Sequence, residues 1–237
     1  MKKRKLLKIS EPHNHSGGNL KDIILGGQDG VVNVLGLILG VAVATFDKKI
    51  VILAGLSSTF AESISMAAVA YTSTKAAQSY YQSLLLKEKQ EIKKIPRLEK
   101  KEIYSIYEEK GFQGKFLESI VNKVTGDKKI WLKTLMAEKF GLLQKEYNNP
   151  RKSALIVGIS SLVGSFIPLL PFFFFNVNLS ILLSLILSGF SLFAAGMVKA
   201  KMTVGTKFKS GLEMLTIGML AAVTGYLVGI IFNKVSM

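Results

Sequence analysis

Residues 23–72 read IILGGQDGVVNVLGLILGVAVATFDKKIVILAGLSSTFAESISMAAVAYT. Two apolar runs, residues 23–45 and 50–72, lie on either side of a short charged break at Asp47, Lys48 and Lys49. A helix needs about 20 residues to cross roughly 30 Å of hydrocarbon, so each run is long enough for one crossing. The break leaves room only for a tight turn. We therefore expect two antiparallel membrane-spanning helices.

Three more apolar runs follow, at residues 154–175, 178–198 and 211–232. Of the 237 residues, 49% are hydrophobic, and they are collected in these runs instead of being spread along the chain. The sequence predicts an all-α, polytopic membrane protein with five transmembrane helices and a helical insert between the second and third. Its parts are a leader (1–22), the first hairpin (23–74), the insert (75–152) and the last three spans (153–237).

The positions of the basic residues, which give the chain a formal charge of +15, indicate how the spans are oriented in the membrane. Of the 31 basic residues, 28 lie in the leader, the insert and the linker between the fourth and fifth spans, whereas only Lys48, Lys49 and Lys234 lie on the other side. The positive-inside rule then places the amino terminus and the insert in the cytoplasm. We interpret the basic excess as topology and contact with anionic lipid, and expect no nucleic-acid binding.

Small residues in the spans predict close helix packing. Glycines stand four residues apart in three places, a spacing that lets helix backbones approach. These pairs are Gly26 and Gly30, Gly36 and Gly40, and Gly225 and Gly229. Pro168 and Pro171 in the third span predict a kink near its outer end.

The insert changes to a charged, amphipathic composition, which predicts a soluble helical segment of about three short helices with a modest core. Pro96 separates one helical stretch from the next. The apolar residues that recur at helical spacing are Ile103, Ile106, Tyr107, Phe116, Ile120 and Val124.

Two carboxylates inside the spans need an explanation, because an ionisable group in a membrane costs roughly 2.5–3.5 kcal/mol on insertion scales. In an antiparallel hairpin, Asp29 and Glu62 fall in the same layer. Met66 lies one turn beyond Glu62, while Asn33 and Ser58 extend the polar stripe. Carboxylates with a thioether suit a transition metal such as Fe²⁺ better than Mg²⁺ or Ca²⁺, so these residues are a candidate transition-metal site. The alternative is that Met66 is an ordinary lipid-facing or packing methionine and that Asp29 is an interfacial residue near a helix end.

A second candidate site lies in the insert. Two pairs of glutamates, each spaced so that its members share a helix face, flank the proline that divides the helices. The predicted metal ligands are Glu88, Glu91, Glu99 and Glu102, with Met136 and Glu138 completing the site. Glutamates three apart among lysines are also typical of any solvated helix, and this alternative stays open on spacing alone.

Other polar residues are less informative. Glu213, beside Lys207 and Lys209, fits a structural ion pair as well as a functional role, and the paired His13 and His15 in the polar leader are left out of the site. There is no cysteine, which excludes disulfides and thiolate metal sites.

Short motifs along nearly the whole chain resemble the vacuolar iron transporter family. They are His-Ser-Gly-Gly-Asn-Leu (15–20), Gly-Gly-Gln-Asp-Gly (26–30), Ile-Ser-Met (64–66) with Ala-Tyr (70–71), Phe-Ile-Pro-Leu-Leu-Pro (166–171) and Ser-Gly-Leu-Glu-Met-Leu (210–215). The resemblance implies five spans, a homodimer with its ion path at the interface of the first two helices, and proton-coupled export of Fe²⁺ from the cytosol.

The resemblance also implies residue roles. Asp29, Glu62 and Met66 would line the path, and the four glutamates around Pro96 match those of the family's cytoplasmic metal-binding domain. The chain departs from that pattern in three places. Leu135 and Met136 stand where better-known members carry two methionines, Lys139 stands where an acid is expected, and Ser58 stands where some members carry the acid of the second span.

We therefore predict a homodimeric Fe²⁺/H⁺ antiporter, with Mn²⁺ as an alternative cargo and no permanently bound cofactor. It would lie in the plasma membrane of a prokaryote or a vacuolar-type membrane of a eukaryote. The alternative is a membrane-anchored metal sensor or a ferroxidase-like enzyme with a di-metal site in the insert. Against the enzyme, the insert lacks the Glu-x-x-His pairs of such sites.

Overall fold

The computed structural model describes residues 16–142, 149–203 and 205–235, which form eight helices. The chain divides into two compact units. One consists of residues 1–71 and 151–237 and is called the five-helix unit below; the other consists of residues 72–150 and is called the insert. His13 and His15 lie outside the described residues.

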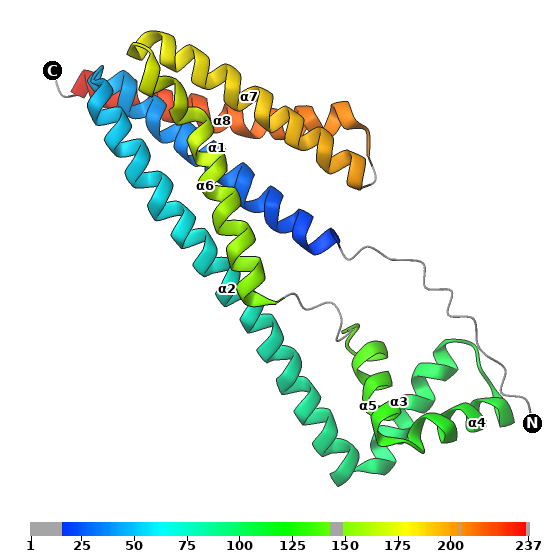
Figure 1. Ribbon diagram of the computed structural model, residues 1–237. Helices are drawn as coiled ribbons and strands as arrows, with labels where there is room; N and C mark the ends of the chain where they lie inside the picture. Colours follow the sequence, from blue (N-terminus) through cyan, green and yellow to red (C-terminus); the bar gives the residue numbers. More distant parts are fainter. Residues whose placement is uncertain (1–15, 143–148, 204, 236–237) are drawn as a thin grey trace, which may run out of the picture. The chain divides into compact units, whose positions relative to one another are not determined.

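Five helices are long and apolar enough to cross a membrane, as the sequence predicts (Figure 1). They are α1 (Ser16–Thr45), α2 (Lys48–Lys94), α6 (Pro150–Phe174), α7 (Val177–Met202) and α8 (Lys207–Val235). Each helix contains its predicted apolar run, except that α6 ends one residue before its run does. All five helices extend several residues beyond their run at one end or both.

Short turns connect α1 to α2 and α6 to α7, and each contains a polar residue that caps the next helix. Between α1 and α2, Phe46 takes a positive φ of 50°. Asp47 then caps α2, because its Oδ1 accepts a hydrogen bond of 2.7 Å from the backbone N–H of Lys49. Asn176 caps α7 in the same way, accepting from the N–H of Leu179 at 3.0 Å. Each tight turn therefore carries a capping side chain at the start of the next span.

Helix α1 packs closely on two neighbours through its glycines. A Cβ at Gly26 would overlap the carbonyl oxygen of Val157 in α6, and one at Gly40 would lie 2.9 Å from the carbonyl oxygen of Gly225 in α8. A Cβ at Gly225 would in turn overlap the carbonyl oxygen of Gly36. The predicted small-residue pairs thus lie at helix contacts, with α6 at one end of α1 and α8 at the other.

Helix α6 continues through both of its prolines to Phe174. Serines of α7 donate hydrogen bonds to the proline carbonyls: Ser184 Oγ to Pro168, and Ser180 Oγ to Pro171 at 3.1 Å. Proline disturbs the helical hydrogen-bond ladder, and neighbouring hydroxyls are a common way to satisfy backbone groups around it in a membrane.

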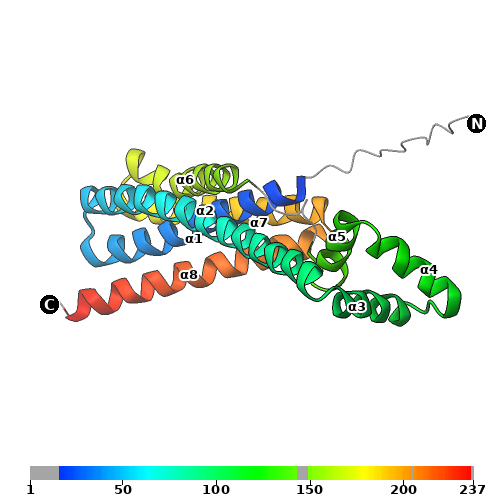
Figure 2. The same cartoon turned by 90° about the horizontal axis from the view of Figure 1, so that it is seen from below.

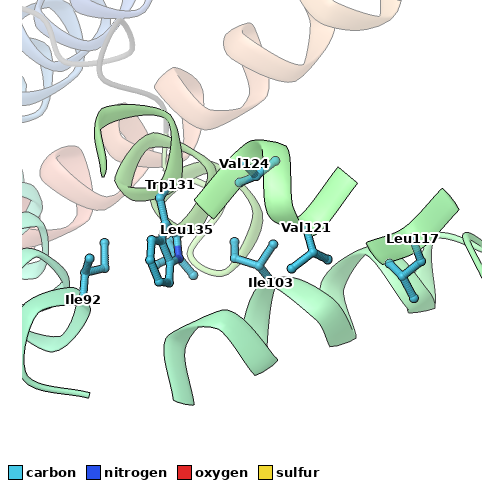
Figure 3. Packing of buried hydrophobic residues seen from close by; sticks show 7 residues of the cluster. All are labelled: Ile92, Ile103, Leu117, Val121, Val124, Trp131 and Leu135. Carbon is cyan, nitrogen blue, oxygen red and sulfur yellow. The ribbon is translucent and has the colours of Figure 1, made fainter. Parts of the chain in front are cut away.

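The insert consists of the end of α2 with α3 (Pro96–Glu109), α4 (Gly114–Thr125) and α5 (Lys128–Glu138). Helices α3 and α4 lie side by side (Figure 2). All four helices contribute to one apolar core (Figure 3). Its buried residues are Ile92, Ile103, Leu117, Val121, Val124, Trp131 and Leu135. The prediction that Phe116 belongs to this core is wrong, because its side chain is 64% exposed.

The second span continues as one helix far beyond its apolar run, from Lys48 to Lys94. Residues 73–94 contain no glycine or proline and are rich in good helix formers, so nothing stops the helix at the end of the span. It ends before Pro96, which disfavours helical geometry at Ile95. The insert therefore begins within a helix and not at a loop.

Candidate metal sites

A polar stripe lies between α1 and α2 of the five-helix unit. The side-chain amide of Asn33 donates a hydrogen bond of 2.7 Å to Oε1 of Glu62. Asp29, one turn before Asn33 on α1, is close enough to Glu62 for their carboxyl groups to interact. The structure thus brings together three of the five residues predicted for the path, from two antiparallel helices.

The other two residues predicted for the path extend the stripe along α2. Ser58 lies one turn before Glu62 and Met66 one turn after it, and both are partly buried. Asn33 is exposed and Glu62 is only partly buried, although both lie within apolar helices. The stripe therefore lies at the surface of the five-helix unit.

Neighbouring carboxyl groups have a clear chemical consequence in this setting. Asp29 and Glu62 repel each other when both are ionised, and a low dielectric strengthens that repulsion. A cation or a proton between them lowers the electrostatic free energy. The amide of Asn33 donates to one oxygen of Glu62, and the same carboxyl group also interacts with Asp29.

One buried acid of the five-helix unit was not predicted. Asp22 is 7% exposed, and its Oδ2 accepts a hydrogen bond of 2.7 Å from the hydroxyl of Ser153 at the start of α6. The sequence offered a signal, since Asp22 stands two helical turns before Asp29 and so falls on the same face of α1. The apolar run begins only at residue 23, so the sequence predicts that Asp22 lies in the leader and outside the spans.

Glu213 forms an ion pair, although with a different lysine from those beside it in the sequence. Its Oε2 lies 3.4 Å from Nζ of Lys199 in α7, and the side chain is 59% exposed. An exposed pair of this kind contributes little to stability.

The insert holds the second acidic cluster. Glu88 of α2 with Glu99 and Glu102 of α3 each place one carboxylate oxygen within 4.8 Å of the others. Glu88 and Glu99 are each only 1% exposed. One oxygen of each, Oε2, is buried without a hydrogen-bond partner among the described residues. Buried carboxylate oxygens are costly without a partner, so this geometry favours a bound cation.

A lysine already contacts this cluster. Nζ of Lys139, just after α5, lies 2.7 Å from Oε2 of Glu102 and 3.3 Å from Oε1 of Glu88. Burial lowers the pKa of the Lys139 ammonium, but the hydrogen bond to Glu102 and the charges of Glu88 and Glu102 raise it more, and its pKa lies above the ordinary value. Lys139 is therefore positively charged at neutral pH.

The structure does not bring the remaining predicted ligands, Glu91, Met136 and Glu138, into this group of three carboxylates. Glu91 is one turn from Glu88 on α2 and forms an ion pair of 3.9 Å with Lys87. Glu138 forms an ion pair with Lys110. Met136 is 1% exposed.

The pKa values of the buried glutamates rise for a common reason. Burial raises the pKa of Glu88 above its ordinary value against the opposing charge of Lys139. Burial, followed by the charges of Glu102 and Glu88, raises the pKa of Glu99 to about 7. The insert thus keeps a carboxyl group whose ionised form disfavours folding in the absence of a cation.

We expect Glu99→Gln to stabilise the metal-free protein at about pH 8 by up to about 3 kcal/mol. Between the ordinary pKa and about 7, the folded insert binds more protons than the unfolded one. The free energy of unfolding therefore falls as pH rises through this window. In the variant this fall should be smaller, with Glu88 contributing what remains. Thermal unfolding of the purified full chain in chelator and detergent, followed by fluorescence, measures it, because the single tryptophan, Trp131, lies in the insert core.

Glu118→Gln provides the matched control, since Glu118 is an exposed glutamate on α4. Glu118→Gln should leave the pH dependence of the free energy of unfolding the same as in wild type. A Glu99→Gln protein less stable than wild type at about pH 8 would show that the buried carboxylate is not a destabilising group.

Comparison with known protein families covers most of the chain. The sequence profile of the VIT family matches residues 20–230, which covers the insert and the five long helices except for the start of α1 and the end of α8. The chain belongs to the VIT family. This confirms the resemblance that the sequence motifs indicate, and the family places the chain among transporters and not among enzymes.

Curated relatives in the family match over most of their length. A vacuolar iron transporter of Centaurea cyanus is 31% identical over 91% of this chain and 89% of its own. Vacuolar iron transporter 2 of Oryza sativa subsp. japonica is 30% identical over 92% and 89%. The vacuolar iron transporter of Plasmodium falciparum is 29% identical over 96% and 87%. This VIT family chain therefore matches these relatives over most of its own length and of theirs.

Proposed function

We propose that this chain carries Fe²⁺ out of the cytosol across a membrane in exchange for protons, with Mn²⁺ as a second cargo. The names of its relatives support iron as the cargo. The observation that carries the proposal is the contact between Asn33 and Glu62, with Asp29 beside it, inside two helices apolar enough to span a bilayer. An ionisable group at such a position is a functional candidate by default.

The ligand types favour a transition metal. Two carboxylates supply hard oxygen ligands, and the thioether of Met66 one turn away adds a soft one. Asn33 and Ser58 extend the oxygen ligands along the stripe. A stripe of several weak positions suits a transporter, because a cargo must bind well enough to enter and weakly enough to leave.

Proton exchange follows from the same carboxylates. When the metal leaves Asp29 and Glu62, two negative groups remain side by side in a low-dielectric region. A proton taken up from the other side of the membrane lowers that cost, and binding of the next metal ion releases it. Each transported ion is thereby linked to proton movement in the opposite direction.

The exposure of the stripe supports a homodimer. Asn33 is exposed and Glu62 partly exposed at the surface of one five-helix unit, where lipid would otherwise face polar groups. A second copy packed on α1 and α2 would cover the stripe from lipid and line the path from its other side. We therefore propose that the path lies at the interface of two copies.

The insert supports capture of the metal before transport. Its cluster of Glu88, Glu99 and Glu102 has two buried oxygens without hydrogen-bond partners among the described residues. We place the insert in the cytoplasm because basic residues are concentrated on its side of the spans. The membrane would be the plasma membrane of a prokaryote or a vacuolar-type membrane.

The proposed topology predicts the accessibility of introduced cysteines, for which the natural chain offers a cysteine-free background. In bacterial cells, Ser119→Cys in the insert should react with a membrane-impermeant maleimide only in inside-out vesicles. Asn178→Cys, at an exposed position in the first turn of α7, should react in intact cells. The opposite pattern would invert the orientation and contradict export from the cytosol.

The cargo is tested by competition in proteoliposomes. Fe²⁺ uptake should be inhibited by excess Mn²⁺ and unaffected by the same concentration of Mg²⁺, because Mg²⁺ prefers oxygen ligands alone and dehydrates reluctantly. Equal inhibition by Mg²⁺ would show that the path does not select a transition metal.

A further inference from the structure

The ammonium of Lys139 lies where a divalent ion would bind among the carboxylates of the insert. Its Nζ bridges Glu88 and Glu102, at 3.3 and 2.7 Å. These two carboxylates and that of Glu99 lie within 4.8 Å of one another. Lys139 thus supplies one positive charge at a position where a metal ion would supply two.

Lys139 satisfies this cluster incompletely. Oε2 of Glu88 and Oε2 of Glu99 are buried and have no hydrogen-bond partner among the described residues. Among the described residues, Lys139 forms ion pairs with Glu88 and Glu102 but not with Glu99, although its charge still acts on Glu99. Three carboxylates around one ammonium leave negative charge that is not neutralised, and buried charge of this kind favours a further or stronger cation.

We propose that Lys139 is a tethered competitor of the captured metal: it holds the cluster together when no ion is bound, and it must leave when a divalent ion enters. The inference rests on the proposed role of the insert in metal capture. It makes Lys139 the residue that sets the affinity of the site, because binding of each ion includes the cost of breaking two charge-assisted contacts.

The insert has a surface groove next to the cluster that could accept the ammonium of Lys139 when it leaves. A surface groove of about 430 Å³ is lined by Glu102, Glu109, Glu138 and Lys139 itself. The side chain of Lys139 is 30% exposed, and its four-carbon stem is flexible. The ammonium can therefore leave the cluster for water and two other carboxylates without movement of the backbone.

Binding of Mn²⁺ to the purified full-length protein in detergent, measured by titration calorimetry, tests the proposal with an ion that does not oxidise in air. Lys139→Met should bind Mn²⁺ more tightly than wild type by about tenfold or more, because the competing charge is gone. Lys139→Arg keeps the charge and should bind as weakly as wild type. Lys133→Met, an exposed lysine of α5, removes the same charge without touching the cluster and should change the affinity little.

An unchanged or weaker affinity in a folded Lys139→Met protein would overturn the proposal. Loss of the lysine leaves buried carboxylates without a partner, so this variant can unfold without metal. A second measurement on the wild-type chain avoids that difficulty. Acylation of lysines, read by mass spectrometry, should be faster at Lys139 with Mn²⁺ than without it and unchanged at Lys133. Equal rates at Lys139 with and without bound Mn²⁺ would also overturn the proposal.

Failure of this inference is distinguishable from failure of metal capture. If wild type binds Mn²⁺ and Glu99→Gln does not, but Lys139→Met equals wild type, the cluster captures metal and only the role of Lys139 is wrong. If neither wild type nor Lys139→Met binds Mn²⁺ in the insert, the capture role is wrong and the inference falls with it.

Discussion

Replacing Glu62 by glutamine is expected to reduce Fe²⁺ flux at least tenfold. Glutamine keeps the size of the side chain and an oxygen for the amide of Asn33, but it removes the negative charge that would bind the metal and later the proton. Loss of an interaction with a charged group costs roughly 1.5–3 kcal/mol, which corresponds to about tenfold or more in rate. Fe²⁺ uptake by proteoliposomes containing equal amounts of wild type and variant measures the effect.

Glu213→Gln is the matched control, because Glu213 is an exposed acid of α8 in a surface ion pair with Lys199. It should transport at close to the wild-type rate. Glu62→Gln should elute as a folded protein in gel filtration, since removing a charge from an apolar helix is not destabilising. Wild-type flux through Glu62→Gln would show that Glu62 is not in the path.

Replacing Gly26 by alanine is expected to destabilise the five-helix unit by about 1–3 kcal/mol and to lower its Tm by roughly 5 °C or more. The new Cβ would overlap the carbonyl oxygen of Val157, and it would also lie 3.0 Å from the carbonyl carbon of Val157 and 3.1 Å from the backbone nitrogen of Ser161. A backbone cannot rotate away as a side chain can, so α1 and α6 would have to separate. Thermal unfolding in detergent measures the change.

Gly27 offers a control one residue away on the same helix. A Cβ there would meet only the carbonyl oxygen of Ser160, at 3.8 Å, which is ordinary contact. Both substitutions gain the same helix propensity, about 1 kcal/mol for alanine over glycine. Gly27→Ala should therefore be neutral or stabilising. Equal Tm values for the two variants would contradict the close packing of α1 on α6.

The hairpin and its site could be predicted because helix geometry has few free parameters. Apolar length fixed the two spans, the short link made them antiparallel, and the helical rise then put Asp29 and Glu62 in one layer. Spacing of glycines predicted the packed faces of α1 but not the partners, since periodicity does not say which helix lies opposite. Contact of Gly26 with α6 and of Gly40 with α8 came from the structure.

The sequence could not predict how neighbouring helices are rotated about their axes, and so which side chains meet between them. The sequence predicts that Asn33 belongs to the polar stripe, and the structure places it there. Its hydrogen bond to Glu62, however, depends on how α1 and α2 are rotated about their axes. The buried pair of Asp22 with Ser153 joins residues 131 positions apart, and no local pattern connects them. Long-range pairing of this kind requires the tertiary structure.

The insert shows the same limit in its details. Spacing predicted two pairs of glutamates, one on each side of Pro96, but could not decide whether the pairs meet. The structure brings Glu88, Glu99 and Glu102 together and leaves Glu91 outside the group. Lys139 was visible in the sequence only as a basic residue at a position where an acid is expected. Its contact with Glu88, 51 residues away, depends on α5 packing on the shared apolar core.

The central claim is that metal and protons move in opposite directions through the Asp29 and Glu62 stripe. Simultaneous recording of Fe²⁺ and internal pH in proteoliposomes, with quenching of an iron-sensitive dye beside a pH-sensitive one, tests it most directly. We predict Fe²⁺ entry accompanied by alkalinisation of the lumen as protons leave, with both signals lost in Glu62→Gln. Fe²⁺ entry equal to that of protein-free liposomes would contradict iron transport, and Fe²⁺ entry with no pH change would contradict proton exchange.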